Sequence, residues 1–119
     1  MEDLLNKEAV KRVKEVIIKF DSKLKILILD STARTAKDAA NSLKSEVGAI
    51  VKSLLLRTDN SFLICLIAGD RRCSLNKLKK IIQKKDVSMA NADEVKINTG
   101  FSIGGVAPVA HIKNLDILI

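Results

Sequence analysis

One short stretch, residues 99–108, holds three of the five glycines and the only proline of this 119-residue chain. Glycine reaches backbone conformations with positive φ and lets other groups approach the main chain closely, whereas proline fixes φ and removes an N–H donor. The stretch therefore predicts one special loop whose backbone N–H and C=O groups form a rigid cradle. An ordinary turn between two strands gives the same pattern.

Composition limits the class of protein to which the chain can belong. The length predicts one domain, and a hydrophobic content of 47% without Trp or Tyr predicts an aliphatic core. No apolar run is long enough to span a membrane, and the acidic start of the chain does not resemble a secretory signal. We therefore expect a cytoplasmic protein that makes no contact with a membrane.

The charged and metal-binding residue types narrow the choice of partners. A net charge of +7 favours a polyanionic partner such as RNA or DNA. The near absence of aromatic residues argues against base stacking, so contacts should go mainly to phosphate groups. Cys65, Cys73 and the only histidine, His111, lack the spacing of a structural zinc site, and we expect no metal.

Hydrophobic periodicity and the capping residues Thr35, Ser74 and Asn91 predict the secondary structure. Strands are expected over 24–29, 50–57, 61–68, 87–90 and 115–119, and helices over 3–20, 36–44, 74–85 and 92–98. Residues 30–32 should end the first strand, and residues 58–60 should form a hairpin turn. The irregular alternation around a hairpin predicts an α+β fold with a mixed sheet and outer helices, not a doubly wound parallel sheet.

Lys52 lies in an aliphatic strand in which both faces are expected to be buried. A buried ammonium group is costly unless it is paired or neutralised, and a lysine kept in such a place often serves a function. A lysine at a sheet edge that extends its ammonium group into solvent is the alternative interpretation.

Four segments taken together resemble a known family. Their order and spacing are similar to those of the YbaK/prolyl-tRNA synthetase editing-domain family, from about Val10 to the end of the chain. Members of this family are aminoacyl-tRNA deacylases, either free-standing or inserted in the synthetase. The segments are residues 35–40 (TAKDAA), 50–56 (IVKSLLL), 68–72 (AGDRR, followed by Leu75, Lys77 and Leu78) and residues 99–108, the glycine loop.

The resemblance implies a curved, mixed, barrel-like β-sheet flanked by helices, with residues 1–119 forming a single editing domain. Family members continue for a further strand pair and helix beyond the apolar end of this chain at residues 115–119. The chain is therefore expected to be a form that is short at its C-terminus.

The resemblance also assigns candidate site residues and a reaction that needs no cofactor. Its catalytic candidates are Lys52, Gly104 and Pro108. Its substrate-binding candidates are Gly105, Val106, Ala107, Thr35, Asp70 and Arg71, although Thr35 also fits a helix cap, and Asp70 and Arg71 also fit a surface turn. The loop would lie opposite the lysine and hold a water molecule against the ester carbonyl, assisted by a hydroxyl group of the tRNA. Cys73 and His111 are not expected to be catalytic.

Two functions follow from these residues. The first is a trans-editing deacylase that removes a small wrong amino acid (alanine, cysteine or serine) from tRNA, with tRNA-Pro favoured. Its partners would be the acceptor end of tRNA and prolyl-tRNA synthetase. The second is a non-catalytic module with the same fold that binds tRNA or a synthetase. Lys77, Lys80 and Lys84 form either a solvated helix face or a track for the acceptor stem.

Overall fold

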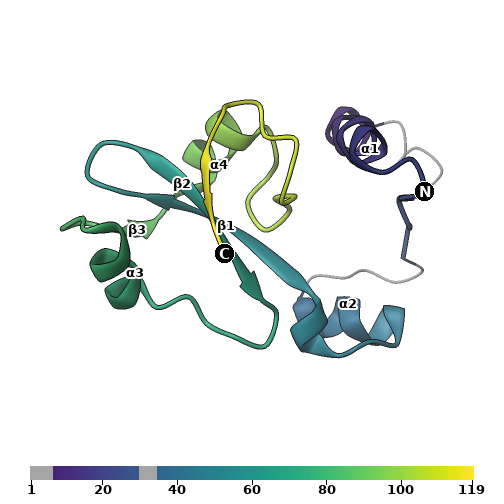
Figure 1. Ribbon diagram of the computed structural model, residues 1–119, viewed down its shortest axis with the longest axis horizontal. Coiled ribbons are helices and arrows are strands. Elements are labelled where there is room, and N and C mark those ends of the chain that lie inside the picture. The colour runs from purple at the N-terminus through teal and green to yellow at the C-terminus, as the bar shows by residue number, and fades with distance from the viewer. Residues whose placement is uncertain (1–6, 30–34) are drawn as a thin grey trace.

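The computed structural model describes residues 7–29 and 35–119. Within these residues the elements follow one another in an irregular order of helices and strands (Figure 1). They are α1 (Glu8–Phe20), α2 (Ala36–Leu43), the 3-10 turn η2 (Val47–Ala49), β1 (Val51–Arg57), β2 (Phe62–Ala68), α3 (Leu75–Ile82), β3 (Ser88–Met89), α4 (Ala92–Thr99) and β4 (Asp116–Leu118).

The sheet is built on the predicted hairpin. β1 and β2 pair in antiparallel fashion along their whole length, from Val51 opposite Ala68 to Arg57 opposite Phe62. The strand order is β3-β1-β2-β4, in which β3 is antiparallel to β1 and β4 is parallel to β2. The mixed α+β sheet is confirmed. It is an open sheet with β3 and β4 at its edges, so it does not close into a barrel.

The strand predicted over residues 24–29 is wrong, because these residues form neither a helix nor a strand. Leu24, Leu27 and Ile28 remain exposed to solvent at 42%, 70% and 39%. An apolar run becomes a strand only where a neighbouring strand pairs with it, so context overrides its intrinsic preference. The predicted break at residues 30–32 and the predicted helical residues 3–6 lie outside the described part of the chain.

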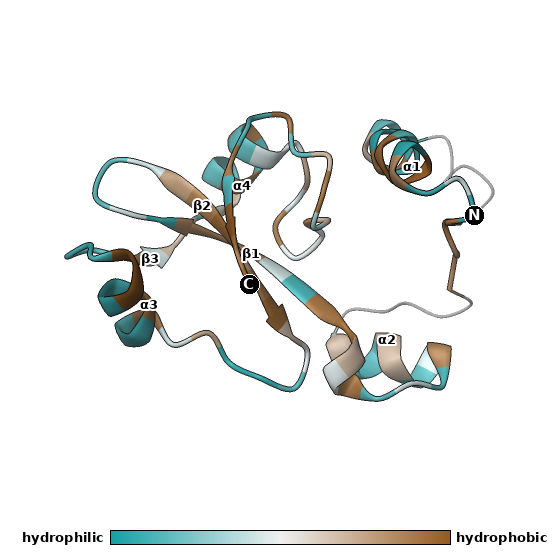
Figure 2. Ribbon diagram, in the orientation of Figure 1, coloured by the Kyte–Doolittle hydropathy of each residue, from teal (hydrophilic) through white to brown (hydrophobic). Residues whose placement is uncertain are grey.

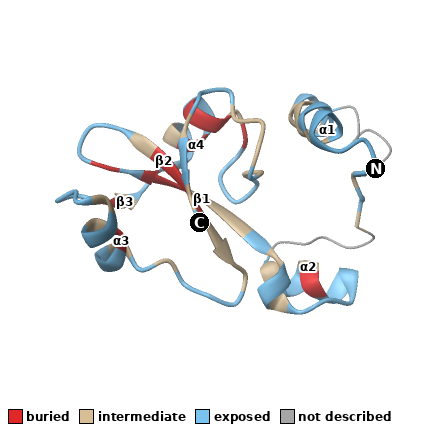
Figure 3. Cartoon of the chain, viewed as in Figure 1, coloured by how far each residue is buried: buried red, intermediate tan, exposed pale blue. Residues whose placement is uncertain are grey.

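Alternation along the hairpin divides the core into two layers. On one face, Leu56 and Cys65 pack with Leu78 of α3. On the other face, Leu55 and Ile64 pack with Val95 of α4. The most buried segments therefore lie in the apolar central strands (Figures 2 and 3). The outer surfaces of the helices are exposed and mix polar residues with apolar ones such as Phe20, Ile81 and Ile97.

The helix caps are those that the sequence predicts. The side chains of Thr35, Ser74 and Asn91 accept hydrogen bonds from backbone N–H groups in the first turns of α2, α3 and α4. α3 ends three residues earlier than predicted, because Gln83 adopts the left-handed conformation with φ 57°. Across the described residues, no helix combines the length and the apolar character needed to cross a membrane.

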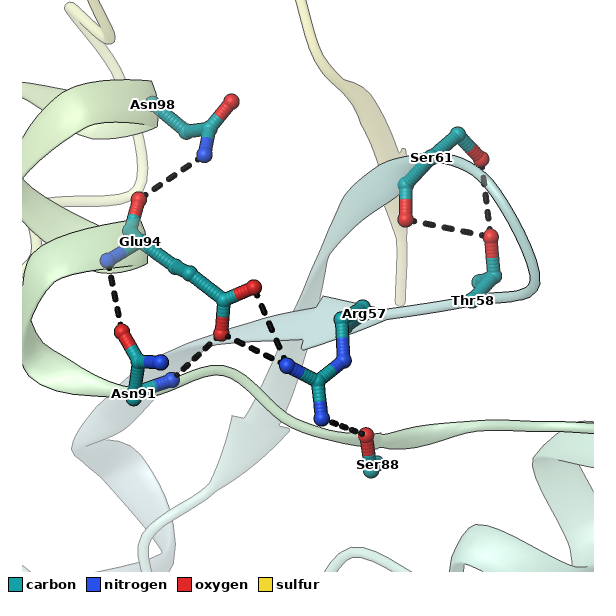
Figure 4. Close-up of polar contacts among 7 residues, drawn as sticks. All are labelled: Arg57, Thr58, Ser61, Ser88, Asn91, Glu94 and Asn98. Atoms are coloured by element: carbon teal, nitrogen blue, oxygen red, sulfur yellow. Dashed lines mark hydrogen bonds and ion pairs between the residues drawn. The ribbon is translucent and has the colours of Figure 1, made fainter.

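A polar network ties α4 to the sheet (Figure 4). Glu94 accepts a hydrogen bond from the backbone N–H of Asn91 at 2.9 Å, while its own N–H donates to the Asn91 side chain at 2.8 Å. The Glu94 carboxylate also pairs with Arg57 of β1 at 3.1 Å, and Arg57 donates to the Ser88 hydroxyl at 3.3 Å. The Asn91 hydrogen bond, and secondarily Arg57, lower the pKa of Glu94 below its ordinary value of 4.5.

This network predicts a pH-dependent contribution to stability. Because the pKa of Glu94 is lower in the folded chain, its charge stabilises the fold above pH 4.5, and this effect is lost as the pH falls through the folded value. Glu94→Gln should therefore lower the free energy of unfolding at neutral pH, and the difference from wild type should shrink in acid. Urea unfolding across this pH range measures both effects.

The matched control is Asp93→Asn, which removes the same charge from the same exposed turn of α4 without touching Arg57. A difference between wild type and Glu94→Gln that stays constant with pH, or an equal profile for Asp93→Asn, would contradict this role of Glu94.

Candidate functional site

A cavity of about 660 Å³ opens between α2, the first half of β1 and the loop that follows α4. Most of its wall is aliphatic, with side chains such as Ile50, Leu54 and Val95. The polar side chains on the wall are few, as is typical of ligand sites. They are Thr35, Lys37, Lys52 and Ser53.

The cavity lies where one edge of β1 is left uncovered by β3. β3 pairs only with Leu56 and Arg57, and Ala90 adds one hydrogen bond from its N–H to the carbonyl oxygen of Leu55 at 3.1 Å. In an antiparallel ladder, alternate residues turn both backbone polar groups to the same side. The N–H and C=O groups of Val51 and Ser53 therefore face the same side as those of Leu55, toward the cavity.

Lys52 stands on this wall and is half-buried. Its ammonium group donates a hydrogen bond to the backbone carbonyl oxygen of Arg71 at 2.7 Å. Since Arg71 lies in the turn just after β2, the hairpin register and this turn together fix the direction of the lysine side chain. The ammonium group carries further N–H donors for a ligand. Lys52 is therefore a charged residue on a mainly aliphatic wall, and its ammonium group is held at the turn after β2.

The glycine loop closes the cavity from the other side through Ile103, Gly104 and Val106. Gly104 has a φ of +80°, a backbone conformation that is strained for residues with a side chain. A Cβ atom at this position would nevertheless meet no atom within 4 Å. Glycine is thus favoured at this position by backbone conformation and not by crowding. The surface beside Gly104 stays open for a ligand.

The structure brings together four of the nine predicted site residues. Thr35, Lys52, Gly104 and Val106 all line the cavity, although Thr35 also caps α2. The remaining predicted residues do not line the wall. They are Gly105, Ala107, Pro108, Asp70 and Arg71. Of these, Arg71 anchors Lys52 through its backbone, and Asp70 packs beside Gly48, where a Cβ atom would lie 2.9 Å from its carboxylate oxygen.

The neighbouring loop residues have supporting contacts. One nitrogen of the His111 ring, Nε2, lies 2.8 Å from the carbonyl oxygen of Ala107. The His111 ring also contacts the buried Phe101 ring edge-on, with centroids 6.1 Å apart. His111 therefore braces the loop from outside the cavity, because it is not part of the cavity wall.

Cys73 does not have the surroundings of an activated nucleophile. Burial raises its pKa, and the neighbouring thiol of Cys65 raises it further, against the smaller lowering effect of Lys52. The thiolate form that attacks substrates is therefore disfavoured. Among the described residues, no group of three or more His, Cys, Asp or Glu side chains is placed to hold a metal ion.

Sequence reasoning missed Ser53 and Arg12. The Ser53 hydroxyl is buried beside the cavity and has no hydrogen-bond partner within the described residues. In the sequence, Ser53 was distinguished only by its position next to Lys52 in the predicted strand. Arg12 contacts the backbone of Thr99, at the start of the glycine loop, and of Ala110, just after its end. Arg12 belongs to a distant part of the chain, so no local pattern could have indicated these contacts.

Known proteins are similar to this chain in sequence and in fold. The proline–tRNA ligase of Caldicellulosiruptor saccharolyticus is 29% identical over 91% of this chain, and that of Kosmotoga olearia is 36% identical over 71%. The chain spans only 17% and 15% of the lengths of these two relatives. The crystal structure of a protein proposed to be a trans-editing enzyme for prolyl tRNA synthetase superposes on this chain with a TM-score of 0.85 and 34% sequence identity. That match covers 93% of this chain and 71% of the solved one.

The family match covers most of the chain and includes all the cavity elements. Residues 30–119 match the aminoacyl-tRNA editing domain family, which includes α2, the β1–β2 hairpin, α4 and the glycine loop. The chain therefore belongs to the aminoacyl-tRNA editing domain family.

Proposed function

We propose that this chain is a trans-editing deacylase that hydrolyses the ester bond between a small amino acid and its tRNA. The observation that carries the proposal is the mainly aliphatic cavity whose wall includes Lys52 on β1 and Gly104 on the glycine loop. Membership of the editing family supports this assignment. The similarity to proline–tRNA ligases favours tRNA-Pro as the substrate tRNA.

The cavity favours catalysis by positioning. Hydrolysis adds water to the ester carbonyl carbon and then breaks the bond to the ribose oxygen, which leaves as a hydroxyl group after taking up a proton. Charge develops on the carbonyl oxygen in the transition state, and fixed N–H donors stabilise it. Lys52 and the backbone N–H groups of the loop are the donors that we assign to the ester and the attacking water.

The aliphatic wall would select the amino acid by size. Alanine, serine and cysteine carry short side chains, whereas proline and larger residues need more room beside Ile50, Leu54 and Val95. A single methylene group changes binding in such a pocket by about 1–3 kcal/mol. The backbone groups of Val51 and Ser53 that face the cavity would hold the polar atoms of the aminoacyl group in register.

The tRNA acceptor end would bind through its phosphates. Because its substrate would be tRNA, we also propose that the chain acts in the cytoplasm. α3 presents Lys77 and Lys80 to solvent, and Lys84 lies exposed just after the end of the helix. Leu78 on the opposite face of α3 packs into the core. This arrangement gives a basic surface that is separate from the cavity wall. Prolyl-tRNA synthetase is the second partner that we propose, on the basis of the similarity to proline–tRNA ligases.

The rival function is a module that binds tRNA or a synthetase without hydrolysis. It would use the same cavity and the same basic surface, so the fold does not separate the two functions. An assay of tRNAs charged with alanine, serine, cysteine and proline separates them. Binding without release of any amino acid would favour the rival.

Lys52→Ala should lower the deacylation rate by about 100-fold, the effect typical of losing one electrostatic stabiliser of the transition state. Steady-state hydrolysis of mischarged tRNA-Pro measures the change. Cys73→Ser is a neighbouring control, because Cys73 lies close enough to Lys52 for their charges to interact but does not line the cavity. Full activity of Lys52→Ala together with an inactive Cys73→Ser would show that the mechanism depends on a thiol instead.

Replacing Lys77, Lys80 and Lys84 by Glu should weaken tRNA binding and make it less dependent on salt. The wild-type plot of log K against log[salt] should slope by roughly −0.7 to −0.9 per phosphate contacted, and the triple variant should have a shallower slope. Binding measured by fluorescence anisotropy tests this. An unchanged slope would mean that the acceptor arm lies on a different surface.

A further inference from the structure

Arg12 of α1 makes three contacts with loop 99–112, which begins at Thr99, the last residue of α4. Its Nε donates to the carbonyl oxygen of Ala110 at 3.3 Å, and its Nη2 donates to that of Thr99 at 3.4 Å. Its guanidinium carbon lies 4.8 Å from the centroid of the Phe101 ring, a cation–π distance. In Figure 1 this loop, coloured yellow-green, extends from α4 toward α1.

The two carbonyl groups that Arg12 binds form the neck of the loop. Ile112 donates its backbone N–H to the Thr99 carbonyl oxygen at 3.2 Å, so the start and the end of the loop lie side by side there. A Cβ atom on Gly100 would lie 2.7 Å from Arg12 Nη2. Gly100 therefore leaves the space into which the guanidinium group fits, and its own φ of +78° also favours glycine.

Contacts inside the loop connect this neck to the cavity. The Phe101 ring under Arg12 is only 4% exposed and packs against the His111 ring. His111 in turn contacts the Ala107 carbonyl oxygen at 2.8 Å. Ala107 directly follows Val106, which lines the cavity. A continuous set of contacts thus leads from the guanidinium group to the cavity wall.

We propose that Arg12 is a positioning residue that fixes loop 99–112 so that Ile103, Gly104 and Val106 stay on the cavity wall. The catalytic consequence rests on the function proposed above, whereas the ordering of the loop does not. α1 buries no residue of its own, so Arg12 is a specific tie between this helix and the loop. A planar guanidinium group can bind two carbonyls and cover a ring at once, which an ammonium group does less well.

Arg12→Met tests the proposal, because methionine keeps apolar cover over the Phe101 ring and removes the donors. Hydrogen exchange at the backbone amides of the loop should become faster, while exchange in β1 and β2 should stay the same. The kcat for deacylation should fall by about 10- to 100-fold, the range expected for misplacing a group at a reacting centre, and KM should change less. Arg12→Lys should give intermediate values for both measurements.

The matched control is Lys14→Met, which removes the same charge from an exposed position on α1. It should leave loop exchange and kcat unchanged. Unchanged loop exchange in Arg12→Met, or faster exchange with an unchanged kcat, would overturn the proposal. An equal loss of activity in Lys14→Met that disappears at high salt would overturn it as well, because Arg12 would then be a contact to tRNA phosphate.

The readouts separate this proposal from the proposed function. If the wild-type chain hydrolyses no mischarged tRNA, the deacylase assignment fails, and the exchange data alone decide whether Arg12 orders the loop. If Arg12 only stabilises the fold, the loss of activity in each variant should match the increase in its unfolded fraction, which urea unfolding measures. Urea unfolding of each variant therefore accompanies the kinetics, and Arg12→Lys serves in place of Arg12→Met if the latter does not fold.

Discussion

The pairing of β1 is the constraint on which the rest of the structure depends. β1 is covered by β2 along its whole length but by β3 only at Leu56 and Arg57. Its second half therefore supplies the most buried core residues, whereas its first half borders a cavity. An uncovered strand edge presents unpaired backbone groups, which proteins normally cover or blunt with charge. Here α2 and the glycine loop enclose that edge, and the cavity is the space between them.

The hairpin register decides which polar groups reach this space. Lys52 lies opposite Ile67, and the turn after β2 then brings the Arg71 carbonyl oxygen to the lysine ammonium group. A slip of one residue would move every side chain of the strand to the other face. The buried side chains of Leu55 and Leu56, which belong to opposite core layers, oppose such a slip. The core thus sets the position of the candidate catalytic lysine.

Local signals in the sequence predicted the local structure. The hairpin and the caps Thr35, Ser74 and Asn91 were predictable because each depends on neighbouring residues. The absence of a strand over residues 24–29 was not predictable, because a strand needs a pairing partner and hydrophobic periodicity does not reveal whether one exists. Within the glycine loop, the sequence indicated the rigid segment but not which of its residues line the cavity. The contacts of Arg12 could not be predicted either, because its partners lie 87 and 98 residues away in the sequence.

The rigidity of the loop bears directly on selectivity in the function that we propose. A pocket that excludes a larger amino acid does so only if its wall resists moving, because an aliphatic surface offers no polar group whose loss would penalise the wrong substrate. The hairpin side of the cavity is held by the core, but the loop side has no strand or helix of its own between α4 and β4. Contacts from outside the loop must then supply the stiffness, and the guanidinium group of Arg12 and the ring of His111 are placed to do so.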